Sequence, residues 1–385
     1  MGDHELPSAQ EASSFSRTFE QPLSEFSTAY VEAVRRPDLG MSATNVGFGQ
    51  RITKEELDAH IGQAYGPEAV LGDVGFSHVY RTPEQESPEQ AVASEFAAVK
   101  LAVDTTLANN GWKPEDVDAV FVGAGAPPVA SYAQKVQELS GLSNATIFHD
   151  GILACNSGIY ELSKALGHRG KKALVVAAEG MTRLAPGFDP READPISRYV
   201  FSNAVVAWTG VPGESLTIIP NLGETFAEPD RTGALAGVML YEMADDEFFQ
   251  ENERVTKIRL PQPPPGYKVF MRGVDTTKMF LRAIRDRSIA WYRKYEKKYG
   301  RENLQFLILH YASRQVVNGI IGAFQKEGIV VDIPSVVPDG NASSANTMKA
   351  LTRLMRRMRK GQDLYIVSIG AGISGTLFFA RVGNL

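Results

Sequence analysis

The stretch Lys113-Pro-Glu-Asp-Val-Asp-Ala-Val-Phe-Val-Gly-Ala-Gly125 indicates the class of fold. Its run from Val117 to Val122 is rich in β-branched and aromatic residues and leads into small residues, which is typical of a buried parallel strand followed by a turn. Before it, Pro88 to Asn110 has the apolar positions of a helix, and Gly111 closes that helix. Helices and apolar strands keep alternating to the end of the chain, so we expect a layered α/β protein.

The same patterns predict the other elements. We expect helices at residues 53–61, 130–139, 155–166 and 278–299, and one that follows Asn341 and runs through Leu351. We expect strands at residues 28–34, 146–148, 173–178, 201–208, 215–219, 304–309, 364–369 and 376–382. Residues 220–265 are irregular and rich in proline, and we expect them to link two halves.

The second half of the chain repeats the order of the first. Helix, polar turn and strand occupy residues 91–122 and again 278–309. A turn of small residues follows in each half, at 154–158 and 340–344, and then a closing apolar strand. Two such units would pack around a pseudo-twofold axis and bring their turns to a shared cleft. We therefore expect an extension at residues 1–27, mobile or draped on the surface, a first half at 28–219 and a second half at 220–385.

Composition excludes several classes of function. Of the 385 residues, 43% are apolar and 22% charged, the balance of an ordinary globular protein, and a formal net charge of -5 gives no support for nucleic-acid binding. No apolar run reaches the roughly 20 residues of a membrane helix, and residues 1–21 are polar with no signal-peptide core. The single cysteine excludes an internal disulfide and a cysteine-only metal site, and it fits a reducing cytoplasm.

That cysteine, Cys155, lies in Asp150-Gly-Ile-Leu-Ala-Cys-Asn-Ser-Gly158, between a short strand and a helix. Small neighbours allow a tight turn, and a thiol at the start of a helix has a lowered pKa. A thiolate there can accept an acyl group from a thioester. The alternative is that Cys155 is a small buried apolar residue, the commonest fate of a free cysteine.

Two further residues are placed where α/β proteins carry out chemistry. His310 ends the apolar strand Phe306-Leu-Ile-Leu-His310, although it could also be a core histidine with satisfied hydrogen bonds. Asn341 precedes a helix, where it could cap the helix or donate a hydrogen bond to a substrate carbonyl. The glycines in Ser368-Ile-Gly-Ala-Gly-Ile-Ser-Gly375 resemble a dinucleotide-binding pattern, but a strand and not a helix is expected after them, so we reject that interpretation.

Taken together, these motifs resemble the thiolase superfamily, and most closely ketoacyl-acyl-carrier-protein synthase III and its relatives. The resemblance runs from about Ala29 to the C-terminus and is carried by Leu-Ala-Cys155-Asn-Ser-Gly, Leu-His310-Tyr-Ala-Ser, Asp-Gly-Asn341-Ala-Ser-Ser-Ala and the glycine-rich segment near Ala371. It implies a five-layered αβαβα fold of two pseudo-twofold-related halves, a homodimer, and acyl thioester substrates carried on coenzyme A or acyl carrier protein. It implies no cofactor and no metal.

The resemblance also implies roles for residues. Cys155, His310 and Asn341 would form the catalytic set, and the backbone N–H groups of Cys155 and Ala371 would form an oxyanion hole. An acyl group would pass to Cys155 and then condense with a malonyl-type thioester after loss of carbon dioxide. Arg183 matches, by position, the arginine that contacts coenzyme A in relatives.

Several positions depart from the family pattern. His310-Tyr-Ala-Ser313 stands where His-Gln-Ala-Asn is usual, which places Tyr311 and Ser313 at a changed edge of the substrate pocket. Phe201-Ser-Asn-Ala-Val205 replaces Phe-Gly-Asp-Gly-Ala, and Gly72 to Phe76 lacks the tryptophan and arginine that grip adenine. These departures favour a specialised fatty-acid or polyketide-type pathway over the start of ordinary fatty-acid synthesis.

The sequence leaves alternatives open. A non-decarboxylating acyltransferase, in which His310 deprotonates an alcohol or amine, would use the same three residues, and a catalytically silent partner subunit is a third reading that their joint presence argues against. Basic residues crowd 282–298 and 353–360. They could dock an acidic carrier protein, or they could be solvated helix faces with local acidic partners.

Overall fold

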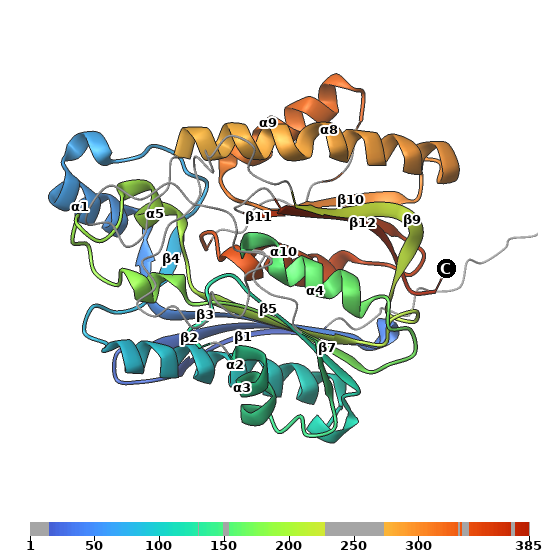
Figure 1. Cartoon of the computed structure of the whole chain (residues 1–385), viewed down its shortest axis with the longest axis horizontal. Coiled ribbons are helices and arrows are strands. Elements are labelled where there is room, and N and C mark those ends of the chain that lie inside the picture. Colours follow the sequence, from blue (N-terminus) through green and yellow to red (C-terminus); the bar gives the residue numbers. More distant parts are fainter. Residues whose placement is uncertain are drawn as a thin grey trace, which may run out of the picture.

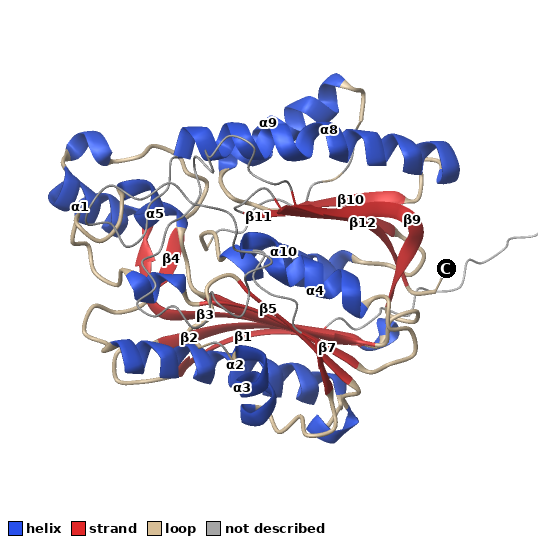
Figure 2. Cartoon of the chain, viewed as in Figure 1, coloured by secondary structure: helices blue, strands red, loops and turns tan. Residues whose placement is uncertain are grey.

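The structure is a computed structural model, and it describes residues 15–129, 131–148, 154–227, 273–329, 332, 339–370 and 374–384. Figure 1 shows five layers stacked from bottom to top: helices, a large sheet, two central helices, a smaller sheet and helices again. Figure 2 shows the two sheets enclosing the central helices α4 and α10. The expected αβαβα architecture is confirmed.

The strands form two sheets. The first sheet has the order β1-β2-β3-β8-β7-β5-β6, with β4 paired to β3, and the second has the order β10-β11-β12-β9. The strand bounds are β1 Phe15–Pro22, β2 Thr28–Arg36, β3 Met41–Thr53, β4 His78–Arg81, β5 Ala119–Ala124, β6 Thr146–Phe148, β7 Ala173–Glu179, β8 Ala204–Gly210, β9 Leu216–Ala227, β10 Leu304–Leu309, β11 Asp363–Gly370 and β12 Ser374–Val382.

The helices occupy three layers. Below the first sheet lie α2 and α3, between the sheets lie α4 and α10, and above the second sheet lie α8 and α9 (Figure 1). The helix bounds are α1 Lys54–Tyr65, α2 Pro88–Asn110, α3 Tyr132–Leu139, α4 Ser157–Ala165, α5 Pro195–Val200, α8 Gly273–Tyr299, α9 Arg314–Lys326 and α10 Ser343–Leu354.

The sheets confirm the internal repeat. In the first half β3, β8, β7 and β5 are neighbours in that order, and in the second half β9, β12, β11 and β10 are neighbours in the same order. The directions also agree: two antiparallel pairings are followed by a parallel one in each half. Asp332 adds a parallel bridge to Phe306 of β10, as β6 does to β5.

Local chemistry explains why the elements start and stop where they do. Ser87 caps α2 in a capping box with Gln90, and Gly111 ends the helix at a φ of +70°, a conformation that glycine adopts without strain. The whole of β7 is buried, as expected for a strand covered by helices on both faces. Apolar side chains of both sheets pack on the central helices, with Trp208 fully buried among them.

The central helices from the two halves meet at their starts. A Cβ atom on Gly158 of α4 would lie only 2.4 Å from the main-chain oxygen of Ser344 in α10. The Oγ of Ser157 also lies 3.2 Å from the main-chain oxygen of Ala124, the last residue of β5. The two turns of small residues seen in the sequence therefore lie side by side in the middle layer.

The N-terminal part of the chain differs from the simple picture of an extension. Its described residues, Phe15–Pro22, form β1, which pairs antiparallel with β2 along its whole length and is largely exposed on both faces. Among the described strands of the second half, none corresponds to β1 or β2. This pair of strands is therefore an addition to the edge of the repeated unit.

Several element boundaries differ from the sequence expectations, among them the following three. The helix expected from Cys155 begins as a 3-10 turn, Ala154–Asn156, and becomes α-helical only at Ser157. The strand expected from Phe201 begins at Ala204. β9 continues to Ala227, inside the region expected to be irregular, because it pairs with β12 from Leu216 to that residue, and pairing outweighs local proline content.

Candidate functional site

Cys155 lies at the turn that leads into α4. It is 4% exposed, and its 3-10 turn packs against α10, β11 and β12. The next residue, Asn156, fixes the turn to the second half because its Nδ2 donates to Oγ1 of Thr376 in β12 at 3.0 Å. The thiol thus lies in the 3-10 turn that leads directly into α4.

His310 directly follows β10. Its main-chain N–H donates to the oxygen of Val367 at 2.9 Å, which extends the pairing of β10 with β11. The side chain is 2% exposed, and its Nδ1 lies 3.4 Å from Oγ1 of Thr347 in α10. Within the described ranges its Nε2 is buried without a hydrogen-bond partner. Burial lowers the pKa of His310 to about 3, so the imidazole is neutral at neutral pH.

Asn341 precedes α10. Its main-chain N–H donates to Val200 at 2.8 Å, and its main-chain oxygen accepts from Ser202 at 3.1 Å. Its side-chain Oδ1 accepts from the N–H of Ser343, the first residue of α10, at 2.9 Å, although the N-cap position is occupied by Ala342 and not by Asn341. Because the oxygen faces the helix, the group that Asn341 can offer to a substrate is its NH₂, a hydrogen-bond donor.

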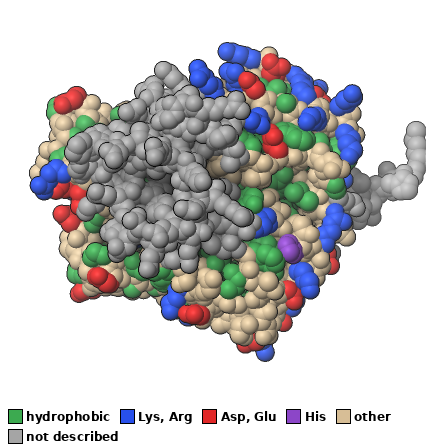
Figure 3. Space-filling view, in the orientation of Figure 1, with side chains coloured by type: hydrophobic (Ala, Val, Ile, Leu, Met, Phe, Trp, Pro, Cys, Tyr) green, Lys and Arg blue, Asp and Glu red, His purple; other side chains and the backbone are tan. Residues whose placement is uncertain are grey.

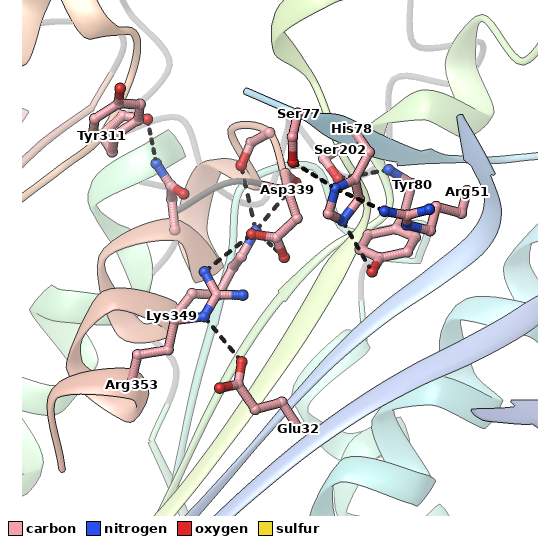
Figure 4. Close-up of polar contacts among 12 residues, drawn as sticks. Glu32, Arg51, Ser77, His78, Tyr80, Ser202, Tyr311, Asp339, Lys349 and Arg353 are labelled. Carbon is pink, nitrogen blue, oxygen red and sulfur yellow. Dashed lines mark hydrogen bonds and ion pairs between the residues drawn. The ribbon is translucent and has the colours of Figure 1, made fainter. Parts of the chain in front are cut away.

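Helix α10 has contacts with the neighbourhood of each of the three sequence-predicted residues. Thr347 contacts His310, Ser343 contacts Asn341, and the turn of Cys155 packs against this helix. Asn346 of α10 also donates to the main-chain oxygen of Tyr311 at 2.7 Å, the contact drawn at the upper left of Figure 4. Segments nearly two hundred residues apart in the chain are thus anchored on one helix.

A buried carboxyl group that the sequence analysis did not single out lies close by. Glu179 ends β7 and is 1% exposed, and burial raises its pKa to about 8. A Cβ atom on Gly125 would lie 2.1 Å from Oε2 of Glu179 and 2.5 Å from Oγ of Ser343, so this carboxyl reaches the start of α10. The sequence signal was an acidic residue at the carboxyl end of a fully apolar strand.

Arg183 is engaged within the protein. Its Nη1 lies 3.2 Å from Oε2 of the buried Glu95 and donates to the oxygen of Gly180 at 2.8 Å, while its Nη2 donates to the oxygen of Ala126 at 2.5 Å. The hydroxyl of Tyr132 also donates to Glu95, at 2.9 Å. The contact of Arg183 with coenzyme A stays a prediction.

The other expected substrate-binding residues have structural contacts. Tyr311 packs edge-on against Phe76, with ring centroids 5.6 Å apart, and its hydroxyl would lie 2.3 Å from a Cβ on Gly75. The Oγ of Ser313 accepts from the N–H of Val316 at the start of α9. Ala371, expected in the oxyanion hole, lies outside the described residues.

Many of the basic side chains have local acidic partners. Arg287 pairs with Glu224, and Arg293 donates to Glu296 at 2.8 Å. Figure 3 shows further lysine and arginine side chains along the upper and right-hand margin of the molecule. The local pairs favour the interpretation of solvated helix faces, and carrier-protein docking stays a prediction.

The described ranges contain neither a cluster of metal-binding side chains nor a membrane-spanning helix. No group of three or more histidine, cysteine, aspartate or glutamate residues there is arranged to hold a metal ion. None of the helices in those ranges is both long and apolar enough to cross a bilayer.

Comparison with solved structures identifies the fold. The 3-oxoacyl-[acyl-carrier-protein] synthase III of Aquifex aeolicus is 17% identical, with a TM-score of 0.60 over 86% of this chain and 96% of that chain. OleA of Xanthomonas campestris is 12% identical, with a TM-score of 0.63 over 86% of this chain and 94% of that chain. A tetronic acid condensing enzyme is 17% identical, with a TM-score of 0.65 over 89% of this chain and 98% of that chain.

These identities establish the fold alone. The chain has the thiolase-like fold of the ketoacyl synthase III proteins, as the sequence motifs predict. No protein-family model and no curated protein matches the sequence.

Proposed function

We propose that the chain is a ketosynthase III-like acyltransferase that carries an acyl group on Cys155 and condenses it with a malonyl-type thioester. One observation supports the proposal: the turn of Cys155 packs against α10, the same helix whose Thr347 contacts His310 and whose Ser343 bonds to Asn341. The fold shared with synthase III, OleA and a tetronic acid condensing enzyme supports it.

The first half-reaction is acyl transfer. The Cys155 thiolate attacks the carbonyl of an acyl thioester, the carrier thiolate leaves and takes up a proton, and one thioester replaces another. The N–H of Cys155 and that of Ala371 would stabilise the oxyanion of the intermediate.

The second half-reaction is condensation. His310 and Asn341 would donate hydrogen bonds to the carbonyl oxygen of a malonyl-type thioester, so that loss of carbon dioxide gives a stabilised enolate. The enolate carbon attacks the acyl carbonyl, and the Cys155 thiolate leaves. The products are a β-ketoacyl thioester and carbon dioxide. A neutral imidazole can play this role, because it still carries one N–H group that donates a hydrogen bond when the proton is on Nε2.

One observation favours a second candidate, acyl transfer to an alcohol or amine without decarboxylation. The hydroxyl of Thr347 donates to Oγ of Ser368 at 3.4 Å, so its oxygen is left to accept a hydrogen bond from Nδ1–H of His310. That tautomer puts a lone pair on Nε2, as a general base needs. Condensation needs the other tautomer, with the proton on Nε2. Both contacts of Thr347 are long, so the substrate could select the form: a bound carbonyl would favour the proton on Nε2, and a bound hydroxyl or amine would favour the lone pair there.

The first experiment is intact-mass analysis after incubation with a panel of acyl thioesters. We expect one acyl adduct per chain, and none in Cys155→Ala. Because Cys155 is the only cysteine, an adduct that persists in that variant would place the acyl group elsewhere and contradict the proposal.

The second experiment separates the two candidates. The acylated protein is mixed with carboxyl-labelled malonyl thioester, and released carbon dioxide is counted. Release that depends on His310 and Asn341 supports condensation, whereas ester or amide formation from an alcohol or amine without release supports the second candidate.

The wider setting is part of the same proposal. The departures near Tyr311 and Phe201 favour a specialised fatty-acid or polyketide-type pathway. The proposed acyl donor is a thioester of coenzyme A or acyl carrier protein, and the proposed location is the cytoplasm. The chain would form a homodimer, and light scattering after gel filtration tests it. The proposed chemistry calls for no metal or cofactor.

A further inference from the structure

A pocket lined by several polar and charged side chains lies outside the residues proposed for acyl transfer. It has a volume of about 460 Å³, within the range of small-molecule sites, and none of Cys155, His310 and Asn341 lines it. We call it the β4–α10 pocket, after two of the elements that line it, where His78 and Tyr80 of β4 face Asp339 and Arg353 (Figure 4).

The floor of the pocket is one face of the first sheet. Thr18 of β1, Glu32 of β2 and Asn45 of β3 are register partners across the three strands, and all three line the pocket. Gly47, two residues along β3, faces the same side; a Cβ atom there would lie 2.2 Å from the ring of Tyr80. The missing side chain lets the Tyr80 ring lie against the strand and form a wall. The floor thus uses β1 and β2, the strands added to the repeat.

The roof carries a surplus of positive charge. Arg353 bonds Oε2 of Glu32 at 2.9 Å and Oδ1 of Asp339 at 3.2 Å, and Arg356 bonds Oε1 of Glu32 at 2.7 Å. Behind them, Nζ of the fully buried Lys349 lies 3.1 Å from Oδ2 of Asp339. Three cations therefore share two carboxylates. Arg51 and Glu20, at the margin, have opposite charges and leave this balance unchanged.

The pKa values of Asp339 and Lys349 support a count of three cations against two carboxylates. Burial disfavours charge on Asp339, but Lys349 and Arg353 outweigh it and hold the pKa of Asp339 at about 2. Burial lowers the pKa of Lys349 to about 8, against the attraction of Asp339, so its ammonium form prevails at neutral pH. One positive charge stays uncompensated among these five side chains, and a guanidinium with five N–H groups can bind a further anion.

The opposite wall offers a hydroxyl donor. Nη2 of Arg51 lies 3.4 Å from Nδ1 of His78, and Oγ of Ser77 lies 2.9 Å from the same nitrogen. Since arginine only donates, Nδ1 accepts, and the ring proton is on Nε2, which lies 3.2 Å from the hydroxyl of Tyr80. Burial lowers the pKa of His78 to about 4, so the ring is neutral. The Tyr80 oxygen accepts from His78, and its own O–H can donate to an occupant.

The floor holds an unsatisfied amide. Asn45 is 3% exposed, and its Oδ1 is buried with no hydrogen-bond partner in the part of the chain that the structure describes. A buried amide oxygen without a donor is unfavourable, and buried polar groups are normally paired. A ligand hydroxyl reaching the floor would supply the missing donor after rotation of the amide.

We propose that the β4–α10 pocket binds a small hydroxylated anion, either a phosphate ester or a hydroxycarboxylate. The anionic group would lie against Arg353, Arg356 and the Tyr80 hydroxyl, and a hydroxyl of the ligand would bond to Asn45. Binding does not depend on the acyl-transfer chemistry, so either proposal can fail alone.

Titration calorimetry of the full chain tests this with two matched pairs of probes. Glycerol 3-phosphate is compared with propyl phosphate, and L-malate with succinate, so that each pair differs only in the ligand hydroxyls and the two pairs differ in the anionic group. We expect one hydroxylated anion to bind about tenfold more tightly than its partner, as a buried hydrogen bond predicts.

Three variants give the site-specific readout. In Arg356→Gln both members of the preferred pair should bind about tenfold more weakly, because one charge-assisted contact is lost. In Asn45→Ala the hydroxyl preference should vanish while anion binding persists. Arg285→Gln, an exposed arginine paired with Asp286 on α8, is the matched control and should bind like the unchanged protein.

The proposal is overturned if no probe binds at about 10 mM, if Arg356→Gln binds as tightly as the unchanged protein, or if the hydroxyl preference survives in Asn45→Ala. Thermal melting of each variant confirms that it is folded. Arg356 is on the surface, so its test does not depend on whether the floor tolerates the loss of Asn45.

Discussion

The hydroxyl of Thr347 lies 3.4 Å from Nδ1 of His310 and donates to Oγ of Ser368 at the same distance. All three side chains are buried and come from α10, the end of β10 and β11. Thr347 is therefore the residue best placed to orient the imidazole, a positioning role in both candidate reactions.

Removal of that hydroxyl should slow the second half-reaction more than the first. In Thr347→Val we expect acyl-Cys155 formation to persist and turnover of the adduct to fall about tenfold, because one buried hydrogen bond to His310 is lost. Thr347→Ser should restore the rate. Thr352→Val on the same helix is the control, since its hydroxyl bonds only the main-chain oxygen of Met348 at 2.9 Å among the contacts described. Equal loss of both half-reactions, or an equal effect of the control, would contradict the role.

His310 should make the fold sensitive to acid. Its pKa is lowered to about 3 in the folded protein, against 6.5 without burial. Between these values the unfolded chain binds a proton that the folded chain does not, so stability falls as pH falls below about 6.5. From pH 6.5 to 5 this amounts to about 2 kcal/mol.

The measurement is the free energy of unfolding in urea at several pH values. His310→Gln should lose that much less stability over the same range. An unchanged pH slope in the variant would show that the folded imidazole is charged, against the environment described here.

Glu179 should have the opposite dependence. Burial raises its pKa from 4.5 to about 8, so the folded chain keeps a proton that the unfolded chain releases. Stability from this group is present below about pH 4.5 and is lost as pH rises towards 8, at roughly 1.4 kcal/mol per pH unit.

Glu179→Gln, which mimics the protonated carboxyl, should remove that slope in urea unfolding. The exposed Glu138→Gln is the control and should leave the slope as it is. An unchanged or steeper slope in Glu179→Gln would mean that the carboxyl is ionised when folded.

Two glycine substitutions should change stability in opposite directions. Gly158→Ala should destabilise the protein by about 1–3 kcal/mol, because the new Cβ would lie 2.4 Å from the main-chain oxygen of Ser344. Gly322→Ala in α9 meets nothing within 4 Å and should stabilise it by about 0.5–1 kcal/mol through helix propensity. Denaturant midpoints of the two variants compare them directly, and a Gly158→Ala that is neutral would mean that the central helices can separate.

Much of the fold was predictable because its core strands are largely apolar. β5, β7, β10 and β11 lie between layers, so their runs of branched residues stand out in the sequence. β1 could not be found in this way. Its side chains are mostly exposed, and only its pairing with β2 makes it a strand.

The candidate site was predictable for a different reason. Cys155, His310 and Asn341 each follow a local signal, but their contacts with α10 depend on packing between distant segments. Thr347 has no signal of its own, since a threonine within a helix is unremarkable until β10 is placed beside it. Glu179 could have been noticed at the end of β7, but its elevated pKa required knowledge of its burial.

Because the two halves repeat the same strand order, a feature built from the repeated strands of one half has a counterpart in the other half. The floor of the β4–α10 pocket uses β1 and β2, which have no counterpart among the described strands of the second half. The pocket floor therefore has no symmetry-related copy in the described part of the second half. Substitutions in the pocket floor therefore need no matching substitution in the other half. We expect related proteins that bind different small molecules in this pocket to differ at positions on β1 and β2 more than at positions in the repeated core.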